Sequence, residues 1–340
     1  MKKTILTLAL IFSGVTLFAQ SAEETLNKWI STYSQLNTEK NWDAMISSFE
    51  QCRSEIPTWD FAFYYKGLAE YNKENYQASV ATFTEFISKN PEDKTILNKA
   101  YMFRAQAFNK QGLSKQAIAD CEELLKANPQ DKDAILEKAN AHIALKDYTS
   151  YIEDLKTVSE LDPNNVEYYK NIASAYGMQK DWQGVIDNLT KAIAINPNEA
   201  AFYNDRAFAY YSLEPKGAEN FQKAVEDYSK AEELGMQTTQ LYTYRAAINN
   251  TLKNYDAVIS DYSKLIELNA NDMNSLYRRA STYYKQNKYK EAIADLNKII
   301  EKDAKNLNAL KLRANCRSKS GDTKGAQADA TLIKELSGAK

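Results

Sequence analysis

A 34-residue period constrains this chain more than any other feature of its 340-residue sequence. The clearest copy is the segment 273–304, MNSLYRRASTYYKQNKYKEAIADLNKIIEKDA. Its first half places Leu276, Ala280 and Tyr283 on one helical stripe, and its second half continues with a stricter apolar stripe after a short polar turn. Because each helix is apolar on one face only, the segment predicts a helix pair that buries its core only beside further copies of itself.

Copies of this helix pair fill nearly the whole sequence. Their spacing is 34 residues, apart from 38 between the second and third copies and 39 between the sixth and seventh. We expect the first excess to start a helix one turn early, and the second, over residues 212–220, to form a projecting loop whose contact with a partner is left open. The expected fold is an all-α solenoid of about nine helix–turn–helix units over residues 21–340. The copies start at Leu26, Asp60, Asn98, Lys132, Val166, Ala200, Thr239, Met273 and Leu307.

The pattern within each copy resembles the tetratricopeptide repeat. Position 8 is small in every copy but the first, which has Tyr33, and position 32 is proline in the first five copies. A small residue suits the point where two helices cross, and proline ends the second helix. The resemblance covers Leu26 to about Gly338 and implies a right-handed superhelix whose first helices line a concave, ligand-binding surface. The position 8 residues are Gly67, Ala105, Ala139, Ala173, Ala207, Ala246, Ala280 and Ala314.

Residues 1–20 are typical of a signal peptide. Lys2 and Lys3 precede the apolar run 5–18, and Ala19 is the expected last residue removed, with cleavage after Gln20 or Ala22 as alternatives. An uncleaved membrane anchor is the other interpretation, although the run is shorter than the ~20 residues that span a bilayer. We therefore expect an exported bacterial protein, periplasmic or secreted, without a transmembrane segment in its mature chain. The net charge of −2 suggests no nucleic acid partner.

The sequence offers no constellation for chemistry. Cys52, Cys121 and Cys316 fall at core positions of repeats that are not neighbours, which predicts buried thiols rather than disulfides. His142 is the only histidine and also falls at a core position. We therefore predict no catalytic residue, no metal site, no cofactor and no enzymatic activity.

Opposite charges recur together within the repeats. Positions 7 and 23 carry a base and an acid in six copies, and the first and fifth copies carry neither. Only the second copy is mismatched, with Lys66 facing Thr82. This covariation predicts an ion pair between the two helices of each repeat, and thus a structural role for these arginines. The six pairs are Arg104–Asp120, Lys138–Asp154, Arg206–Asp227, Arg245–Asp261, Arg279–Asp295 and Arg313–Asp329.

The resemblance also indicates where a partner would bind. Positions 2, 5, 9, 12 and 13 face the concave surface in the family, and here many are aromatic or amide residues suited to an extended peptide. The alternative for each tyrosine is a ring that packs with its hydroxyl in water. We therefore expect a protein–protein interaction scaffold of the bacterial cell envelope, or alternatively an exported protein that binds a glycan or small ligand. Its oligomeric state is not predicted. The candidate residues are Phe61, Tyr64, Leu68, Tyr71, Asn72, Asn109, Asn140, Asn204, Phe208, Tyr211, Asn250, Tyr277, Ser281, Tyr284 and Lys285.

Overall fold

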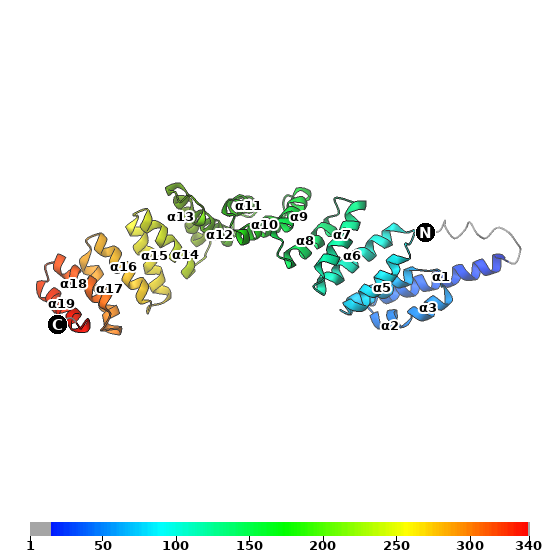
Figure 1. Ribbon diagram of the computed structural model, residues 1–340, viewed down its shortest axis with the longest axis horizontal. Coiled ribbons are helices and arrows are strands. Elements are labelled where there is room, and N and C mark those ends of the chain that lie inside the picture. Colours follow the sequence, from blue (N-terminus) through cyan, green and yellow to red (C-terminus); the bar gives the residue numbers. More distant parts are fainter. Residues whose placement is uncertain (1–14, 339–340) are drawn as a thin grey trace. The chain divides into compact units, whose positions relative to one another are not determined.

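The computed structural model describes residues 15–338, which form nineteen α-helices and no strand (Figure 1). The expectation of an all-α fold is thus confirmed over these residues. They divide into two compact units, residues 15–164 and 165–338. Most of the predicted signal segment, residues 1–14, lies outside the described residues, and α1 begins at Val15.

The first unit contains nine helices. Each packs against its neighbours in sequence, as in a helical-repeat solenoid. Their bounds are α1 (Val15–Thr38), α2 (Trp42–Ser47), α3 (Phe49–Glu55), α4 (Phe61–Asn72), α5 (Tyr76–Ser88), α6 (Lys94–Lys110), α7 (Ser114–Ala127), α8 (Lys132–Ala144) and α9 (Tyr148–Leu161).

The second unit contains ten helices that form five successive pairs, again with neighbours in sequence packed together. Their bounds are α10 (Val166–Gln179), α11 (Trp182–Ile195), α12 (Ala200–Ser212), α13 (Ala218–Glu233), α14 (Thr239–Thr251), α15 (Tyr255–Leu268), α16 (Met273–Lys285), α17 (Tyr289–Lys302), α18 (Leu307–Lys319) and α19 (Thr323–Leu336). None of the helices over residues 15–338 combines the length and the apolar character needed to cross a membrane.

Side-chain caps explain why many repeats start where the period places them. Asp131, Asn165, Asp272 and Asn306 directly precede α8, α10, α16 and α18, and each accepts a hydrogen bond from a backbone N–H of the first turn. A free N–H that gains such a partner stabilises a helix start by about 1 kcal/mol. These helices begin at Lys132, Val166, Met273 and Leu307, the first residues of their repeats.

The turns between paired helices share one backbone conformation. The residue at position 15 has a positive φ in eight of the nine repeats, with values between 54° and 88°. Only two of these residues are glycine. In the other six repeats a residue with a side chain adopts the left-handed backbone conformation, which costs free energy but keeps the turn tight. The residues are Lys40, Glu74, Gly112, Lys146, Lys180, Lys253, Asn287 and Gly321.

The first irregular spacing behaves as predicted, and the second forms a loop that is shorter than the predicted 212–220. Helix α6 begins at Lys94, four residues before the start that the period assigns to the third repeat at Asn98. The second excess lies between α12 and α13, where residues 213–217 form the connecting loop of the sixth repeat. Both insertions are therefore absorbed without breaking the order of helix pairs.

Close approach of paired helices explains the small residue at position 8. A Cβ on Gly67 would lie 2.9 Å from the ring of Phe83, which is fully buried on the partner helix. Alanine at this position is also buried in the third to eighth repeats, for example Ala280 at 0% exposed, whereas Ala314 of the ninth repeat is half-buried. The first repeat departs from the rule, because Tyr33 is fully buried there and stacks on Tyr65 at a centroid distance of 5.0 Å.

The three cysteines are free and buried, as the sequence predicts. Cys52 and Cys121 lie in the core of the first unit, and Cys316 lies in that of the second. Burial raises the pKa of all three thiols, that of Cys121 to about 12 and those of Cys52 and Cys316 to about 11. They are packing residues rather than reactive thiols.

Candidate functional site

The predicted ion pairs are present in all six repeats that carry them. In the five arginine pairs, Nε and Nη2 donate to the carboxylate of the same repeat and form a two-pronged contact. Lys138 lies 2.9 Å from Asp154. The other distances are 2.8 and 2.6 Å for Arg104–Asp120, 2.8 and 2.8 Å for Arg206–Asp227, 3.0 and 2.7 Å for Arg245–Asp261, 2.8 and 2.7 Å for Arg279–Asp295, and 3.1 and 2.7 Å for Arg313–Asp329.

The third arginine nitrogen makes a contact that the sequence analysis missed. Nη1 of each arginine donates to a hydroxyl or amide oxygen at position 25 of the preceding repeat, over 2.7–3.2 Å. Each arginine therefore joins the two helices of its own repeat and also ties that repeat to the one before it. The sequence held a signal, because position 25 is Thr, Ser or Asn before every arginine. The acceptors are Thr84, Thr190, Ser229, Ser263 and Asn297.

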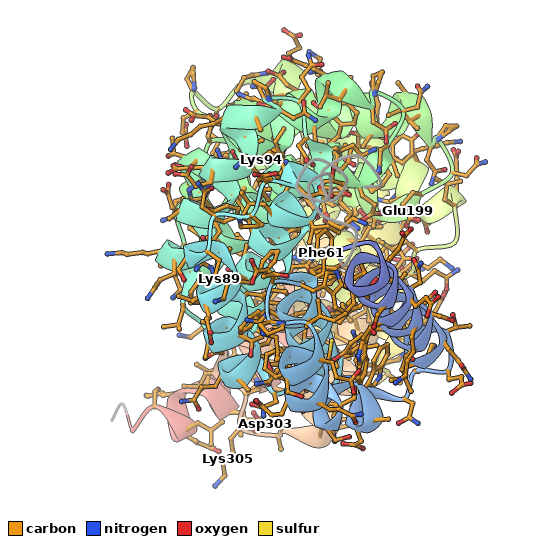
Figure 2. The ribbon with its side chains drawn as sticks, turned by 90° about the vertical axis from the view of Figure 1, so that its right-hand side faces the viewer. Phe61, Lys89, Lys94, Glu199, Asp303 and Lys305 are labelled. Atoms are coloured by element: carbon orange, nitrogen blue, oxygen red, sulfur yellow. The ribbon has the colours of Figure 1, made fainter. Side chains whose placement is uncertain are left out.

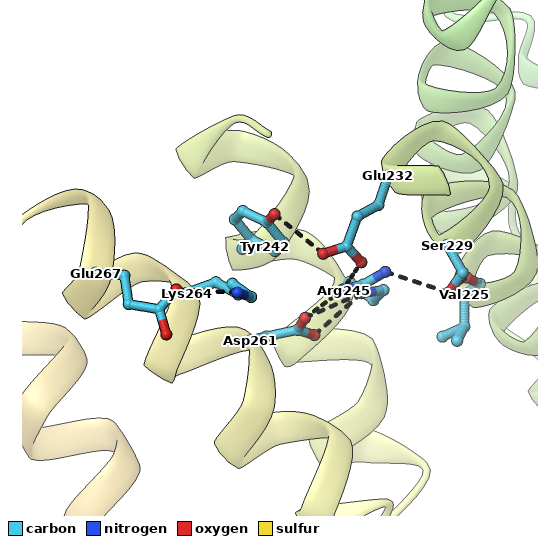
Figure 3. Close-up of polar contacts among 8 residues, drawn as sticks. All are labelled: Val225, Ser229, Glu232, Tyr242, Arg245, Asp261, Lys264 and Glu267. Atoms are coloured by element: carbon cyan, nitrogen blue, oxygen red, sulfur yellow. Dashed lines mark hydrogen bonds and ion pairs between the residues drawn. The ribbon is translucent and has the colours of Figure 1, made fainter. Parts of the chain in front are cut away.

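The Arg245 contact is the most buried of the set. Figure 3 shows its polar contacts. Its Nη2 donates to Asp261 and to Glu232, both over 2.7 Å, and Tyr242 donates to Glu232 over 3.1 Å. Burial opposes the charge on Arg245, but hydrogen bonds and attraction from Asp261 and Glu232 outweigh it and raise the pKa of the guanidinium. All three nitrogens of this group donate to protein acceptors, which gives it a structural role.

The second repeat also has an acid beside its base, although the sequence analysis found none at position 23. Thr82 donates to Glu70 over 2.6 Å, and the ammonium of Lys66 lies 3.9 Å from the same carboxylate. In this repeat the acid lies at position 11 of the first helix, whereas in the six paired repeats it lies at position 23 of the second helix. Burial raises the pKa of Glu70, and the hydrogen bond from Thr82 opposes that shift.

Position 11 explains the single histidine as well. His142 Nδ1 lies 2.8 Å from Asp154, the acid that also pairs with Lys138. In the ninth repeat Arg317 occupies this position and contacts Asp329 over 2.9 Å. His142 thus serves helix packing. Among the residues that the structure describes, no three His, Cys, Asp or Glu side chains are placed to hold a metal ion.

In the first unit, most candidate residues are used for packing. Tyr64 is only 8% exposed and contacts Phe83 and Phe103, and Tyr71 packs edge-on against Phe103. Amides are also engaged: Asn72 donates to the carbonyl of Leu68, and Asn109 donates to the backbone and side chain of Glu137. Leu68 is half-buried against the same core, whereas Asn140 is exposed.

Phe61 is separate from the other candidates. It stacks on Trp59 at 6.4 Å and lines a surface pocket with Asp93, just before the start of α6 at Lys94. Figure 2 labels Phe61 together with Lys89 and Lys94, which flank the connection between α5 and α6. The structure therefore does not gather the first-unit candidates into one site.

In the second unit, two candidates meet in an aromatic pocket between α10, α11, α12 and the start of α14. Asn204 and Phe208 line it beside Trp182, which meets the Phe208 ring edge-on at 5.6 Å. The pocket encloses about 220 Å³, and Lys170, Asp205 and Gln240 supply polar groups at its wall. We refer to these residues as the aromatic pocket.

Further rings continue from the aromatic pocket. Phe208 lies 5.3 Å from Tyr244, which contacts Tyr211 at 5.6 Å. Tyr228 stacks on Tyr244 at 6.5 Å, and its buried hydroxyl lacks a hydrogen-bond partner within the described part of the chain. Burial raises the pKa of Tyr228. The rings hold Phe208 in place from one side while the pocket stays open on the other.

Four other candidates line a polar groove between α14, α16 and the start of α18. They are Asn250, Tyr277, Ser281 and Lys285. The groove has an open volume of about 520 Å³. Tyr284, at the same end of α16, packs instead on Tyr289 at 5.7 Å and does not line the groove.

Sequence reasoning missed several wall residues. Gln240, Asn274 and Asn308 occupy position 2, which the family pattern assigns to the concave surface, so that signal was present. Trp182 was not among the candidate residues, and Arg278 stands at position 6, which the pattern leaves unassigned. Their place in these walls depends on how successive helices pack, which one repeat does not reveal.

Comparison with known proteins identifies the repeats. Family models described as tetratricopeptide repeat match residues 64–132 and 274–306. The DnaJ homolog subfamily C member 7 homolog of Dictyostelium discoideum is 28% identical over 106 residues, which are 31% of this chain and 20% of that protein. Hsp70-Hsp90 organizing protein 2 of Arabidopsis thaliana is 28% identical over 102 residues, 30% of this chain and 17% of that protein. The chain thus spans a fifth or less of these curated relatives.

A solved structure shares the fold. The C-terminal part of a TPR repeat-containing protein from Cytophaga hutchinsonii has a TM-score of 0.58 and 13% identity, covering 73% of this chain and 98% of that chain. The chain therefore carries tetratricopeptide repeats, and its consecutive helices pack as in a tetratricopeptide-repeat solenoid. Such repeats are in general modules that bind a protein or a peptide.

Proposed function

We propose that this chain is an exported, non-enzymatic scaffold of the bacterial cell envelope that captures an extended segment of another protein on its second unit. The aromatic pocket is the observation that carries this proposal. A rigid aromatic side chain at the wall of a pocket is the usual anchor of a protein–protein contact. Here Phe208 is held between Trp182 and Tyr244 and is still half-buried rather than covered.

The size of the aromatic pocket favours a peptide over a small ligand. Its volume of about 220 Å³ is below the roughly 300–1,000 Å³ of sites that enclose a drug-sized molecule. One bulky side chain of a peptide fits such a space, while its backbone meets the amides of Asn204 and Gln240 at the wall. The curated relative from Arabidopsis thaliana, named as an organizer of Hsp70 and Hsp90, supports binding of protein partners in general.

Replacing Phe208 by alanine is expected to weaken peptide binding by about thirtyfold or more, since truncating an interface anchor costs roughly 2 kcal/mol. The measurement is binding of the full chain to an array of decapeptides of varied sequence and to an array of oligosaccharides. Leu268→Ala is the control, because Leu268 is 49% exposed and lines neither pocket nor groove. Binding to oligosaccharides but not to peptides would show that the alternative, a glycan-binding protein, is correct.

Export rests on the N-terminal pattern of Lys2, Lys3 and the apolar run 5–18. When the full chain is produced in a bacterium, we expect the envelope fraction to hold a shortened protein that begins at Gln20. Mass spectrometry of the N-terminal peptide measures this directly. Changing Lys2 and Lys3 to glutamate removes the basic segment and is expected to leave the precursor uncut in the cytosol. A wild-type protein that keeps Met1 and stays in the cytosol would show that the chain is not exported.

A further inference from the structure

The aromatic pocket has two charged residues at its wall, and only one of them has an ionic partner. Lys170 forms an ion pair with Glu167 on the same helix. Asp205 accepts a hydrogen bond from the neutral amide of Asn204 over 3.0 Å, and within the described residues no cation lies at ion-pair distance from it. Asp205 is exposed at the wall, yet nearby protein atoms displace enough water to raise its pKa. The protein therefore leaves one negative charge of the pocket uncompensated.

A buried hydroxyl close to Asp205 also lacks a partner. Tyr228 is 1% exposed, and its oxygen makes no hydrogen bond among the residues that the structure describes. Burial raises its pKa, and electrostatic repulsion from Tyr244, Asp205 and Tyr211 adds to the shift, so the oxygen lies near these three groups. A buried hydroxyl without a hydrogen bond costs free energy. The carboxylate and the hydroxyl can both accept, so a ligand rich in donors suits both of them.

The rings of the pocket suit a flat cation. Trp182 and Phe208 meet edge-on with an interplanar angle of 88°, so they form two sides of a corner at the wall. Tyr244 contacts Phe208 at 5.3 Å and helps to fix it. The face of an aromatic ring attracts a cation, and a guanidinium also stacks on it because it is planar. An apolar side chain would cover Asp205 without giving its charge a partner, which is costly.

Four arginines of this chain already combine the three kinds of partner that this place offers. Arg279 donates two nitrogens to Asp295 and the third to the hydroxyl of Ser263. Its guanidinium carbon lies 6.0 Å from the centroid of the Tyr283 ring. The aromatic pocket has the carboxylate, the rings and the nearby hydroxyl, but no arginine among the described residues lines it. The other three that contact a carboxylate, a hydroxyl and a tyrosine ring are Arg104, Arg206 and Arg245.

We propose that the aromatic pocket binds an arginine side chain of the captured segment. The guanidinium lies in the corner between Trp182 and Phe208 and donates to the carboxylate of Asp205, next to the hydroxyl of Tyr228. Its five N–H donors form a rigid fork that can serve several acceptors at once, whereas lysine offers a compact point charge. The proposal rests on the proposed function, because it specifies which residue of the partner segment enters the pocket.

The test uses the full chain and an array of decapeptides with neutral, varied flanks and one central arginine, citrulline, lysine or phenylalanine. Citrulline has nearly the shape of arginine but carries no charge, and both peptide ends are blocked, so the central residue is the only source of charge. We expect the wild type to bind the arginine peptides about tenfold or more tightly than the citrulline peptides, because hydrogen bonds to charged groups are the stronger ones. The preference is expected to shrink at high salt.

The variant Asp205→Asn is expected to bind arginine and citrulline peptides equally, because the amide keeps the shape of the side chain and removes its charge. Asp187→Asn is the matched control and should keep the preference. Asp187 is exposed on α11, accepts from the neutral amide of Gln183 over 2.7 Å and does not line the pocket. Both substitutions change the net charge by the same amount.

The outcomes separate this site from the proposed function. Equal binding of arginine and citrulline peptides by the wild type, or an arginine preference that survives in Asp205→Asn, overturns the arginine site alone if the phenylalanine peptides bind and Phe208→Ala weakens them. Lysine peptides that bind as tightly as arginine peptides overturn the choice of arginine. Failure to bind any peptide overturns the proposed function as well.

Discussion

Replacing Arg245 by leucine is expected to lower the free energy of unfolding of the second unit by about 3–5 kcal/mol, because the change leaves a buried carboxylate without its partner. Asp261 is 1% exposed and accepts hydrogen bonds from two nitrogens of Arg245. Glu232 loses its hydrogen bond from the same guanidinium. Urea denaturation of the full chain measures the loss. Hydrogen exchange in α14 and α15 locates it, since local opening should begin where the charge is unpaired.

Two variants make this result specific. Lys264→Met removes a lysine that pairs with Glu267 over 2.9 Å on the exposed side of α15, and we expect a change of at most about 1 kcal/mol. Arg245→Lys keeps the charge but loses the two-pronged contact, so its effect should fall between the other two. If Arg245→Leu were as stable as the wild type, the arginine–carboxylate pairs would not hold the helices together, and a ligand-binding role for this arginine would have to be considered.

The arginine–carboxylate pairs distinguish two kinds of arginine along a single helix. Arg278 and Arg279 are neighbours on α16, yet Arg279 is bound by Asp295 and Ser263, whereas Arg278 donates to the neutral side chain of Asn274 at the groove. A row of arginines on the repeats resembles a binding surface until their covariation with aspartate is noticed, which predicts a structural role. Because these arginines are engaged by protein partners, the cations outside the arginine–carboxylate pairs are the better candidates for ligand binding.

The fold was largely predictable because repetition multiplies weak local signals. Many helix starts have one side-chain cap, such as Asp131 or Asn165, and most helix crossings have one small residue, such as Gly67 or Ala280. The same weak signals therefore recur along the chain. Where the first repeat breaks the pattern, the second helix is divided at Ser48 into α2 and α3. The periodicity of the sequence did not predict this division of the helix. The division of the chain at Asn164 was not expected either.

The candidate site was less predictable, because a family position says which face a residue occupies but not what its side chain contacts. Tyr277 lies in the wall of the groove, whereas Tyr64, at the same repeat position, is packed into the core. Asn109 likewise donates its NH₂ group to the backbone and side chain of Glu137 in the next repeat. Such differences depend on the neighbouring repeat, which varies from one place to the next even though the period does not.

Replacing Arg279 and Asp295 together by leucine is expected to restore most of the stability that either single change removes. Arg279→Leu leaves Asp295, 3% exposed, without its cation and should cost about 3–5 kcal/mol. The double change removes both charges, and replacing a whole buried pair by apolar residues is often neutral or better.

The contact of Arg279 with the preceding repeat does not prevent this double change. Ser263 loses the hydrogen bond from Arg279 but still donates to the carbonyl of Ile259 over 2.7 Å, so no buried hydroxyl is left unpaired. A double-mutant cycle by urea denaturation measures the coupling, which should be several kcal/mol and favourable, since the two side chains share their hydrogen bonds. A double variant much less stable than either single variant would show that the two residues stabilise the helices independently, and that Arg279 is held by something other than Asp295.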